Sequence, residues 1–347
     1  MFTILVGALL PSVMLVYLIY RVDRFVEPTS SIVIAFLTGM GSPFITLFFS
    51  YLFNLNLDQA LHPWMYALSM AALPEELGRL LLLLWVCKSW RAVGEPFDCL
   101  VYGATIWAGF ASTENSLYAL NELKTGDSPV VILAIRASLC TMGHTAWGVI
   151  MGAHVALFRY SEDRSARWLL RGLLITVVLH LLYDGLLLSV HQGWPLLKVA
   201  GAIIVDSFSL VLATVILIRL RAIQGISRGE GDLRLLQSEL FKRHMPDSTA
   251  GLLEIVSQFG VSGLFKIIFA MGCSSLGLGL ILNGLSAPSV DLLYSGGLIY
   301  VGLKSWRSAL QTAYRVHLKT GSQLHDELAV VKQKRRPRLS FRPFKKD

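Results

Sequence analysis

The chain has 347 residues, a formal net charge of +8, and a composition that is 54% hydrophobic and only 16% charged. A soluble domain carries about 25% charged residues. The apolar residues here come in runs of about twenty, the length that crosses a bilayer as a helix. These figures exclude an ordinary soluble domain and predict an all-α fold, a polytopic transmembrane helical bundle.

Apolar runs separated by polar breaks predict the membrane spans. The first, FTILVGALLPSVMLVYLIY, has neither a basic region before it nor a small-residue cleavage site after it, so we interpret it as a span and not as a signal peptide. The last has a core of only about a dozen apolar residues, so the total is nine spans, or eight. The expected spans are 2–20, 31–53, 66–87, 99–121, 130–158, 168–190, 197–219, 261–285 and 289–306.

Basic residues alternate between the loops and indicate the orientation. The loops after the second, fourth and sixth spans hold almost none, only Lys124 and Lys198. By the positive-inside rule we expect the N-terminus outside and the C-terminus in the cytoplasm, at the cell membrane if the source is bacterial. The basic residues of the other loops are Arg21, Arg24, Lys88, Arg91, Arg159, Arg164, Arg167, Arg219, Arg221, Arg228 and Arg234.

Two polar segments lie near the end of the chain. Residues 221–258 contain LRLLQSELFKRH, in which Leu233, Leu236 and Leu240 share one helical face, as in a short cytoplasmic helix lying on the membrane or on the bundle. The tail KQKRRPRLSFRPFKK is strongly basic. Attraction to anionic lipid headgroups explains this tail, and a nucleic-acid role has no other support.

Ionisable residues inside the spans are the main functional signal, because a charge in the bilayer costs about 2.5–3.5 kcal/mol and usually marks a site. The third span holds Glu75, Glu76 and Arg79. In the expected orientation, Glu75 and Glu76 fall in one layer between mid-bilayer and the outer leaflet with Glu114, His144 and His180 of the next three spans, and we expect a common water-filled cavity there. The later residues are Glu114, His144, His180 and Asp184.

Helical spacing suggests pairs within this set. Glu75 and Arg79 are four residues apart, which favours Glu75 as the partner of the arginine and Glu76 as the free base, although the i,i+3 spacing also allows the reverse. His180 and Asp184 share a face in the same way. Other buried ionisable residues are interpreted as structural: His154, Arg136 and Asp206.

At this point the residues resemble a known family. PEELGR, FDCLVYGATIWAGFASTENSLYA, MGHTAWGVIMGAH and HLLYDG look like the successive motifs of the PrsW-type intramembrane proteases, within the superfamily of CAAX-prenyl proteases and bacteriocin-processing enzymes. The resemblance covers about residues 66–190. It implies site roles for Glu75 and Glu76, Arg79, Phe110, Glu114 and Asn115, His144, and His180 with Asp184. In the prenyl-protease branch the second motif ends in His and the last in Asn, so the roles known there transfer only loosely to Glu114 and Asp184.

The residues therefore predict an intramembrane endopeptidase. Glu75 or Glu76 would activate a water that Glu114 positions, and His180, helped by Asn115 or His144, would stabilise the oxyanion. No cofactor is required by this mechanism, but two histidines and several carboxylates also allow a zinc-dependent version. A proton or cation transporter using the same buried groups is the alternative from another class. The resemblance suggests a single-span regulatory protein of the anti-sigma type as substrate.

The same pattern divides the chain into four parts. A seven-span membrane domain at 1–220 holds the catalytic core at about 66–190, and a helical insert follows at 221–258. A C-terminal transmembrane hairpin is expected at 259–306, and a basic cytoplasmic tail at 307–347.

Overall fold

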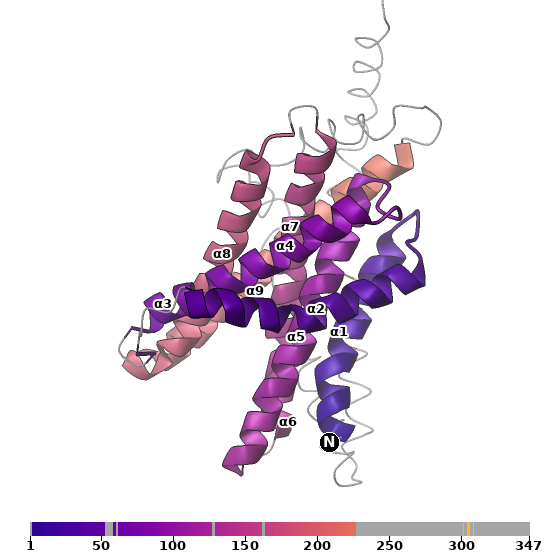
Figure 1. Ribbon diagram of the computed structural model, residues 1–347. Helices are drawn as coiled ribbons and strands as arrows, with labels where there is room; N and C mark the ends of the chain where they lie inside the picture. The colour runs from indigo at the N-terminus through magenta and orange to yellow at the C-terminus, as the bar shows by residue number, and fades with distance from the viewer. Residues whose placement is uncertain are drawn as a thin grey trace, which may run out of the picture.

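The computed structural model describes residues 2–52, 58–59, 62–126, 129–161 and 164–226, with four further residues at 301, 304, 305 and 308. Within these residues the fold is entirely helical (Figure 1). A π-helical turn, η1 (Ala67–Ala72), joins α3 to α4, and a short 3-10 turn, η2 (Val190–Gln192), precedes α9. The helices are α1 (Phe2–Val22), α2 (Thr29–Leu52), α3 (Pro63–Tyr66), α4 (Leu73–Ser89), α5 (Pro96–Thr125), α6 (Pro129–Ser138), α7 (Cys140–Tyr160), α8 (Arg167–Leu188) and α9 (Pro195–Ile226).

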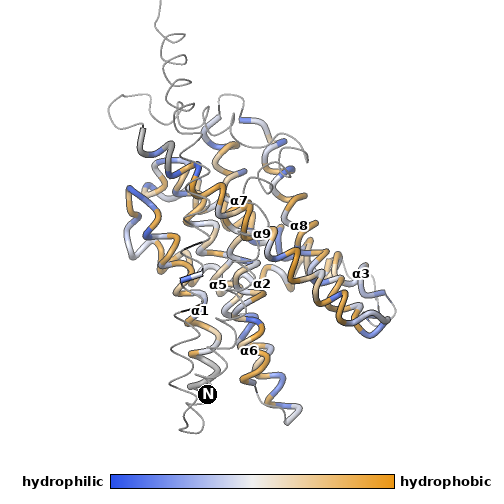
Figure 2. Tube along the Cα trace, turned by 180° about the vertical axis from the view of Figure 1, so that it is seen from behind, coloured by the Kyte–Doolittle hydropathy of each residue, from blue (hydrophilic) through white to orange (hydrophobic). Residues whose placement is uncertain are grey.

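Each of the first seven expected spans corresponds to helix in the structure. In the part of the chain that the structure describes, four stretches are long and apolar enough to cross a membrane, namely 29–52, 129–160, 167–188 and 195–221, and Val6–Val22 is a shorter apolar helix. Figure 2 shows hydrophobic residues along the helices and hydrophilic residues gathered at their connections. Apart from residues 301, 304, 305 and 308, the expected spans 261–285 and 289–306, the insert beyond Ile226 and the basic tail lie outside the described residues, so the total of nine stays a prediction.

Helix α5 is the centre of the bundle, with α2 crossing in front of it in Figure 1. Every residue of α5 from Pro96 to Ser112 is buried. The helix begins with a reciprocal capping box between Glu95 and Asp98, which satisfies its first backbone N–H groups. It packs closely on α7, because a Cβ atom added at Gly103 would overlap the carbonyl oxygen of Gly148.

The entrance to α4 is widened at a proline. Pro74 has no N–H and its ring crowds the carbonyl one turn earlier, so the regular α-helical series of backbone hydrogen bonds is interrupted there. The backbone opens into η1, where the N–H of Leu73 bonds to the carbonyl of Leu68. The hydroxyl of Ser50 on α2 then donates to the freed carbonyl of Met70 at 3.1 Å. Turns of this kind are frequent at functional sites, and two glutamates follow at once.

The fifth expected span is divided into α6 and α7 at Leu139. The helical hydrogen bonding is only locally disturbed. The Leu139 N–H donates to the Ile135 carbonyl and the Gly143 N–H to the Leu139 carbonyl, both at 2.9 Å. Thr141 Oγ1 donates to the carbonyl of Arg136 at 3.1 Å, so a side chain takes up a backbone acceptor at the break. Neither a glycine nor a proline stands at Leu139 to signal this division in advance.

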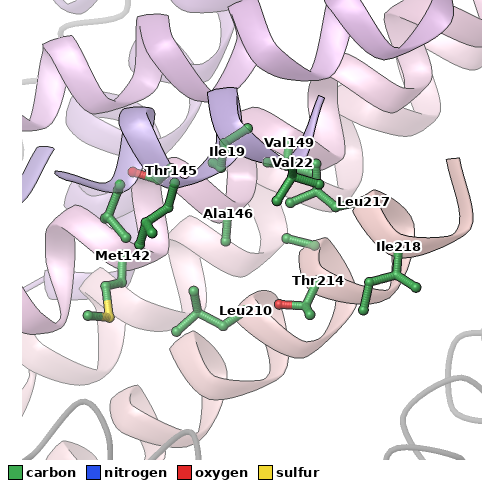
Figure 3. Close-up of a pocket in the computed structure, with 13 residues that line it drawn as sticks. Ile19, Val22, Met142, Thr145, Ala146, Val149, Leu210, Thr214, Leu217 and Ile218 are labelled. Atoms are coloured by element: carbon green, nitrogen blue, oxygen red, sulfur yellow. The ribbon is translucent and has the colours of Figure 1, made fainter. Parts of the chain in front are cut away.

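A cavity of about 130 Å³ lies between α1, α7 and α9. Its lining is aliphatic apart from Thr145 and Thr214, and Figure 3 shows these side chains gathered around it. The α7 residues that line it follow helical spacing on one face: Met142, Thr145, Ala146 and Val149. None of the ionisable residues singled out above lines this cavity, so it is separate from their cluster.

Candidate active site

Helix α4 places two carboxylates on one guanidinium directly after Pro74. Arg79 Nη2 donates to Glu75 Oε2 at 3.1 Å and to Glu76 Oε1 at 2.8 Å. Its Nε donates to the backbone oxygen of Glu75 at 3.1 Å. The helical spacing favoured Glu75 as the partner of Arg79, whereas in the structure Arg79 bonds to both Glu75 and Glu76. The guanidinium carbon also lies 3.9 Å from the centre of the Phe110 ring, which covers the charge from the α5 side.

Glu76 is the more enclosed of the two glutamates. Its side chain is 0% exposed, against 12% for Glu75. Besides Arg79, it contacts His180 Nδ1 through Oε1 at 3.1 Å and accepts from Trp107 Nε1 through Oε2 at 3.0 Å. Both carboxylate oxygens therefore have donors already. This geometry suits a group that orients its neighbours, and leaves Glu75 facing the rest of the cluster.

Two histidines present the same ring nitrogen to Glu75. His144 Nδ1 donates to the carbonyl of Cys140 at 2.7 Å, as His180 Nδ1 does to Glu76. In a neutral imidazole whose Nδ1 carries the proton, Nε2 has the free lone pair. The Nε2 atoms of His144 and His180 lie 4.0 Å and 3.7 Å from Glu75 Oε2. Trp147 fixes both rings, with centroid separations of 4.9 Å and 4.6 Å.

Two further carboxylates form the rim of this cluster. Asp184 Oδ2 lies 3.2 Å from His180 Nε2, and Glu114 Oε2 lies 3.7 Å from His144 Nε2. Their side chains are 25% and 21% exposed, more than any other charged member of the cluster. A substrate would therefore approach from the side of Asp184 and Glu114.

The structure thus brings together residues from four separate helices, as their common depth in the membrane predicts. Asn115 stands behind the cluster, with its side chain buried between Arg136 and Thr141. His154 lies ten residues further along α7 than His144 and bonds to the Ile150 carbonyl at 2.8 Å. Asp206 is buried against Gly143, and neither of its carboxylate oxygens has a hydrogen-bond partner among the described residues.

Sequence reasoning did not assign a role to the two tryptophans or place Arg136 at the cluster. Trp107 lies three residues before Phe110, and Trp147 three residues after His144, so each shares a helical face with an expected site residue. Arg136 Nη2 lies 2.7 Å from Glu114 Oε2. The helical spacing was a usable signal for the tryptophans, whereas the partner of Arg136 is on another helix.

The cluster fits a metal ion. The ligand atoms of Glu75, His144 and His180 all lie within 4.8 Å of one another. A tetrahedral zinc with bonds of about 2.0–2.1 Å separates its ligand atoms by about 3.3 Å, so shifts of less than about 1 Å per atom would close the site. His144 Nε2 is buried without a hydrogen-bond partner among the described residues, as a ligand nitrogen would be before metal binding. Each Nδ1 is held by a carboxylate or a carbonyl, the usual outer contact of a metal-bound histidine.

Comparison with known proteins places the chain in a family. Residues 27–218 match the model of the "PrsW family intramembrane metalloprotease". The chain belongs to the PrsW family of intramembrane proteases. It is 30% identical to Protease PrsW of Geobacillus kaustophilus over 196 residues, covering 56% of this chain and 83% of the relative. It is 29% identical to Protease PrsW of Bacillus subtilis over 196 residues, with 56% and 86% covered. No solved structure matches the chain.

Membership in the PrsW family confirms the resemblance carried by the four motifs and extends it to both sides of residues 66–190. The chain is an integral multi-pass membrane protein and an intramembrane protease, and the transporter interpretation is set aside. The match reaches residue 218, so most of α9, including its buried Asp206, falls within the family region. The family description names a metalloprotease, and the group formed by Glu75, His144 and His180 could hold the metal.

Proposed function

We propose that this PrsW-family chain is a zinc-dependent endopeptidase that cuts a peptide bond in or near the membrane segment of another membrane protein. One observation carries the proposal. The Nε2 atoms of His144 and His180 face the same oxygen of Glu75, while both Nδ1 atoms are held by other acceptors. Two histidines and a glutamate form the ligand set of zinc peptidases with an open fourth position.

Bound there, zinc would supply a water of lowered pKa and polarise the scissile carbonyl. The residues of the chain do the rest. Glu76 orients His180, and Arg79 holds both glutamates in place. Asp184, at the rim beside His180, takes the proton of the attacking water on Oδ2 and returns it to the leaving amine. Trp147 and Phe110 pack against the histidine rings and exclude bulk water from them.

A metal-independent version of the reaction is supported by a different contact. His180 Nε2 lies 3.2 Å from Asp184 Oδ2, so both nitrogens of this ring have carboxylate partners in the absence of a metal. In this version Glu75, the more open of the two glutamates, activates the water together with Glu114. In their imidazolium forms, His180 and His144 then donate to the oxyanion from Nε2.

Chelation distinguishes the two versions. The full chain, purified in detergent, is incubated with a panel of single-span transmembrane peptides with and without 1,10-phenanthroline, and its zinc content is measured. The zinc version predicts about one zinc per chain, loss of cleavage with the chelator, and loss of both zinc and cleavage in Glu75→Gln. Glu122→Gln on α5, away from the cluster, is the matched control. If zinc-free protein still cleaves the peptides in the presence of the chelator, the zinc version is excluded and the metal-independent version is supported.

The substrate class and the orientation are part of the same proposal. The family resemblance suggests a single-span membrane regulator of the anti-sigma type, and the basic tail is suited to anionic lipids. The alternation of basic loops places the N-terminus outside and the C-terminus in the cytoplasm. A reporter fused after residue 163 should then be cytoplasmic, and one at Gly126 should be outside. The opposite result would move the site to the cytoplasmic half of the membrane.

A further inference from the structure

A closed circuit of hydrogen bonds holds Arg136 at the edge of the cluster. Arg136 Nε donates to Asn115 Oδ1 at 3.0 Å, and Asn115 Nδ2 donates to Thr141 Oγ1 at 2.9 Å. Thr141 Oγ1 donates in turn to the backbone oxygen of Arg136 at 3.1 Å. The Tyr118 ring packs on the guanidinium, with 3.8 Å from its carbon to the ring centre. The circuit joins α5 to the break between α6 and α7 and fixes the direction of one side chain.

The guanidinium points at the rim of the site. Arg136 Nη2 lies 2.7 Å from Glu114 Oε2, which lies 3.7 Å from His144 Nε2. Glu114 therefore stands between Arg136 and the proposed ligand group. The contact with Glu114 is an ion pair without the geometry of a hydrogen bond, since Nη2 has no hydrogen-bond acceptor among the described residues. A group arriving between Glu114 and His144 would meet a fixed cation with a proton still to donate.

Two other donors near the site are either bonded already or fully enclosed. Asn115, one candidate from the sequence for stabilising the oxyanion, is 0% exposed, and it donates its amide to Thr141 and accepts from Arg136 with its oxygen. Arg79 is likewise 0% exposed. Its Nε and Nη2 are bonded to the two glutamates of α4, and its Nη1, which has no hydrogen-bond partner among the described residues, is enclosed with the rest of the side chain. Of these two guanidinium groups, Arg136 is the one beside Glu114, a carboxylate of the more open rim.

We propose that Arg136 is a catalytic residue whose guanidinium donates a hydrogen bond to the oxyanion of the tetrahedral intermediate, with Asn115 and Thr141 as its positioning residues. This inference rests on the proposed peptidase function. When water attacks, the carbonyl electron pair moves onto oxygen, and it returns as the C–N bond breaks and the amine leaves with a proton. Arg136 stabilises the charge in between and transfers no proton, because a guanidinium stays protonated. Removing one such donor typically lowers kcat about 10²–10³-fold.

The test compares the transition state with the ground state. Wild type, Arg136→Gln and Arg136→Lys are assayed on a transmembrane peptide that wild type cleaves. Each protein is then titrated with a phosphinic dipeptide, which mimics the tetrahedral anion, and with the corresponding uncleavable N-methyl amide. We expect Arg136→Gln to lower kcat about 10²–10³-fold and to weaken phosphinate binding by a similar factor, with amide binding and zinc content unchanged. Arg159→Gln, at the far end of α7, is the matched control.

The outcomes separate this inference from the function on which it rests. If wild type cleaves no peptide of the panel, or Glu75→Gln cleaves as well as wild type, the proposed function fails. If wild type behaves as proposed and Arg136→Gln retains its kcat, or loses phosphinate and amide binding equally, Arg136 is not the oxyanion donor. Should Arg136→Gln not fold, Arg136→Lys decides the point: it keeps a charge beside Glu114 but not the forked donor. A loss of phosphinate affinity in that variant without a loss of amide affinity supports the proposal, and equal losses of the two overturn it.

Discussion

Replacing Glu75 and Glu76 in turn by glutamine separates the two roles that we propose for them. In Glu76 both oxygens accept hydrogen bonds, from Arg79, His180 and Trp107. In the Glu76→Gln variant an amide nitrogen replaces one of these oxygens, and at either position it faces a donor. Arg79 also loses the closer of its two carboxylates. Breaking a buried charge pair in this way costs about 3–5 kcal/mol of folding free energy, and loosening the outer contact of His180 lowers metal affinity about 10–100-fold.

Glu75→Gln should behave differently. Glu75 accepts from Arg79 through Oε2 alone, so a glutamine can keep that bond with its oxygen, and Arg79 retains Glu76. We expect a loss of stability below about 1.5 kcal/mol, the scale of a single weakened hydrogen bond. Cleavage and zinc binding should be lost, because a charged ligand has been removed.

Thermal unfolding in detergent, zinc content and turnover are measured for both variants beside wild type. The signature is an inactive but stable Glu75→Gln and a clearly destabilised Glu76→Gln with reduced zinc affinity. The spacing alone favoured the opposite, with Glu76 as the free base and Glu75 bound to Arg79. A stable, inactive Glu76→Gln together with an unstable Glu75→Gln would therefore refute the reasoning from burial and restore that assignment.

Three further outcomes are expected. Incubation with 1,10-phenanthroline should lower the melting temperature of wild type, and zinc should restore it, whereas Glu75→Gln should show neither change, because only a metal bound to the folded state stabilises it. Gly143→Ala should cost about 1–3 kcal/mol, because its Cβ would overlap the Asp206 carboxylate; most of this loss should disappear in the Asp206→Ala background, and equal losses in both backgrounds would exclude the contact. Burial raises the pKa of Glu27, in the connection between α1 and α2, above its ordinary value near 4.5. Its neutral form is thus the stable one when folded, so stability is greatest below that value and falls as pH rises through the raised pKa. Glu27→Gln should flatten this part of a melting-temperature profile, and an unchanged slope would assign it to another group.

The first seven helical spans and the convergence of residues at the candidate site could be predicted from the sequence for the same physical reason. An apolar run of about twenty residues has one stable arrangement in lipid, a helix. A charge inside such a run is costly unless it faces protein or water. The shared depth of Glu75, Glu114, His144 and His180 therefore predicted their convergence, and the contacts of 3.7–4.0 Å among them agree.

The breaks in the helices were harder to predict from the sequence. Pro74 is visible in the sequence, but the π-helical turn before it depends on Ser50 of α2, which satisfies the freed carbonyl of Met70. At Leu139 the break has no Gly or Pro signal, and Thr141 supplies a local donor to the backbone. In both places a side-chain hydroxyl makes the irregular backbone tolerable, and a hydroxyl is too common in sequence to mark such a position.

The roles of the two glutamates depend on how α4 is rotated about its axis, and here the sequence is uninformative for a specific reason. After Arg79 the helix reads LLLLLW, so every face is apolar and no periodicity tells the protein side from the lipid side. In the structure Leu80 and Leu83 are buried and Leu81 and Trp85 are exposed. Glu76 shares the face of Leu80 and Leu83, which turns it toward Trp107 of α5 and away from the rim. Spacing within a membrane helix thus groups residues on faces, but only contacts between helices decide which face meets the substrate.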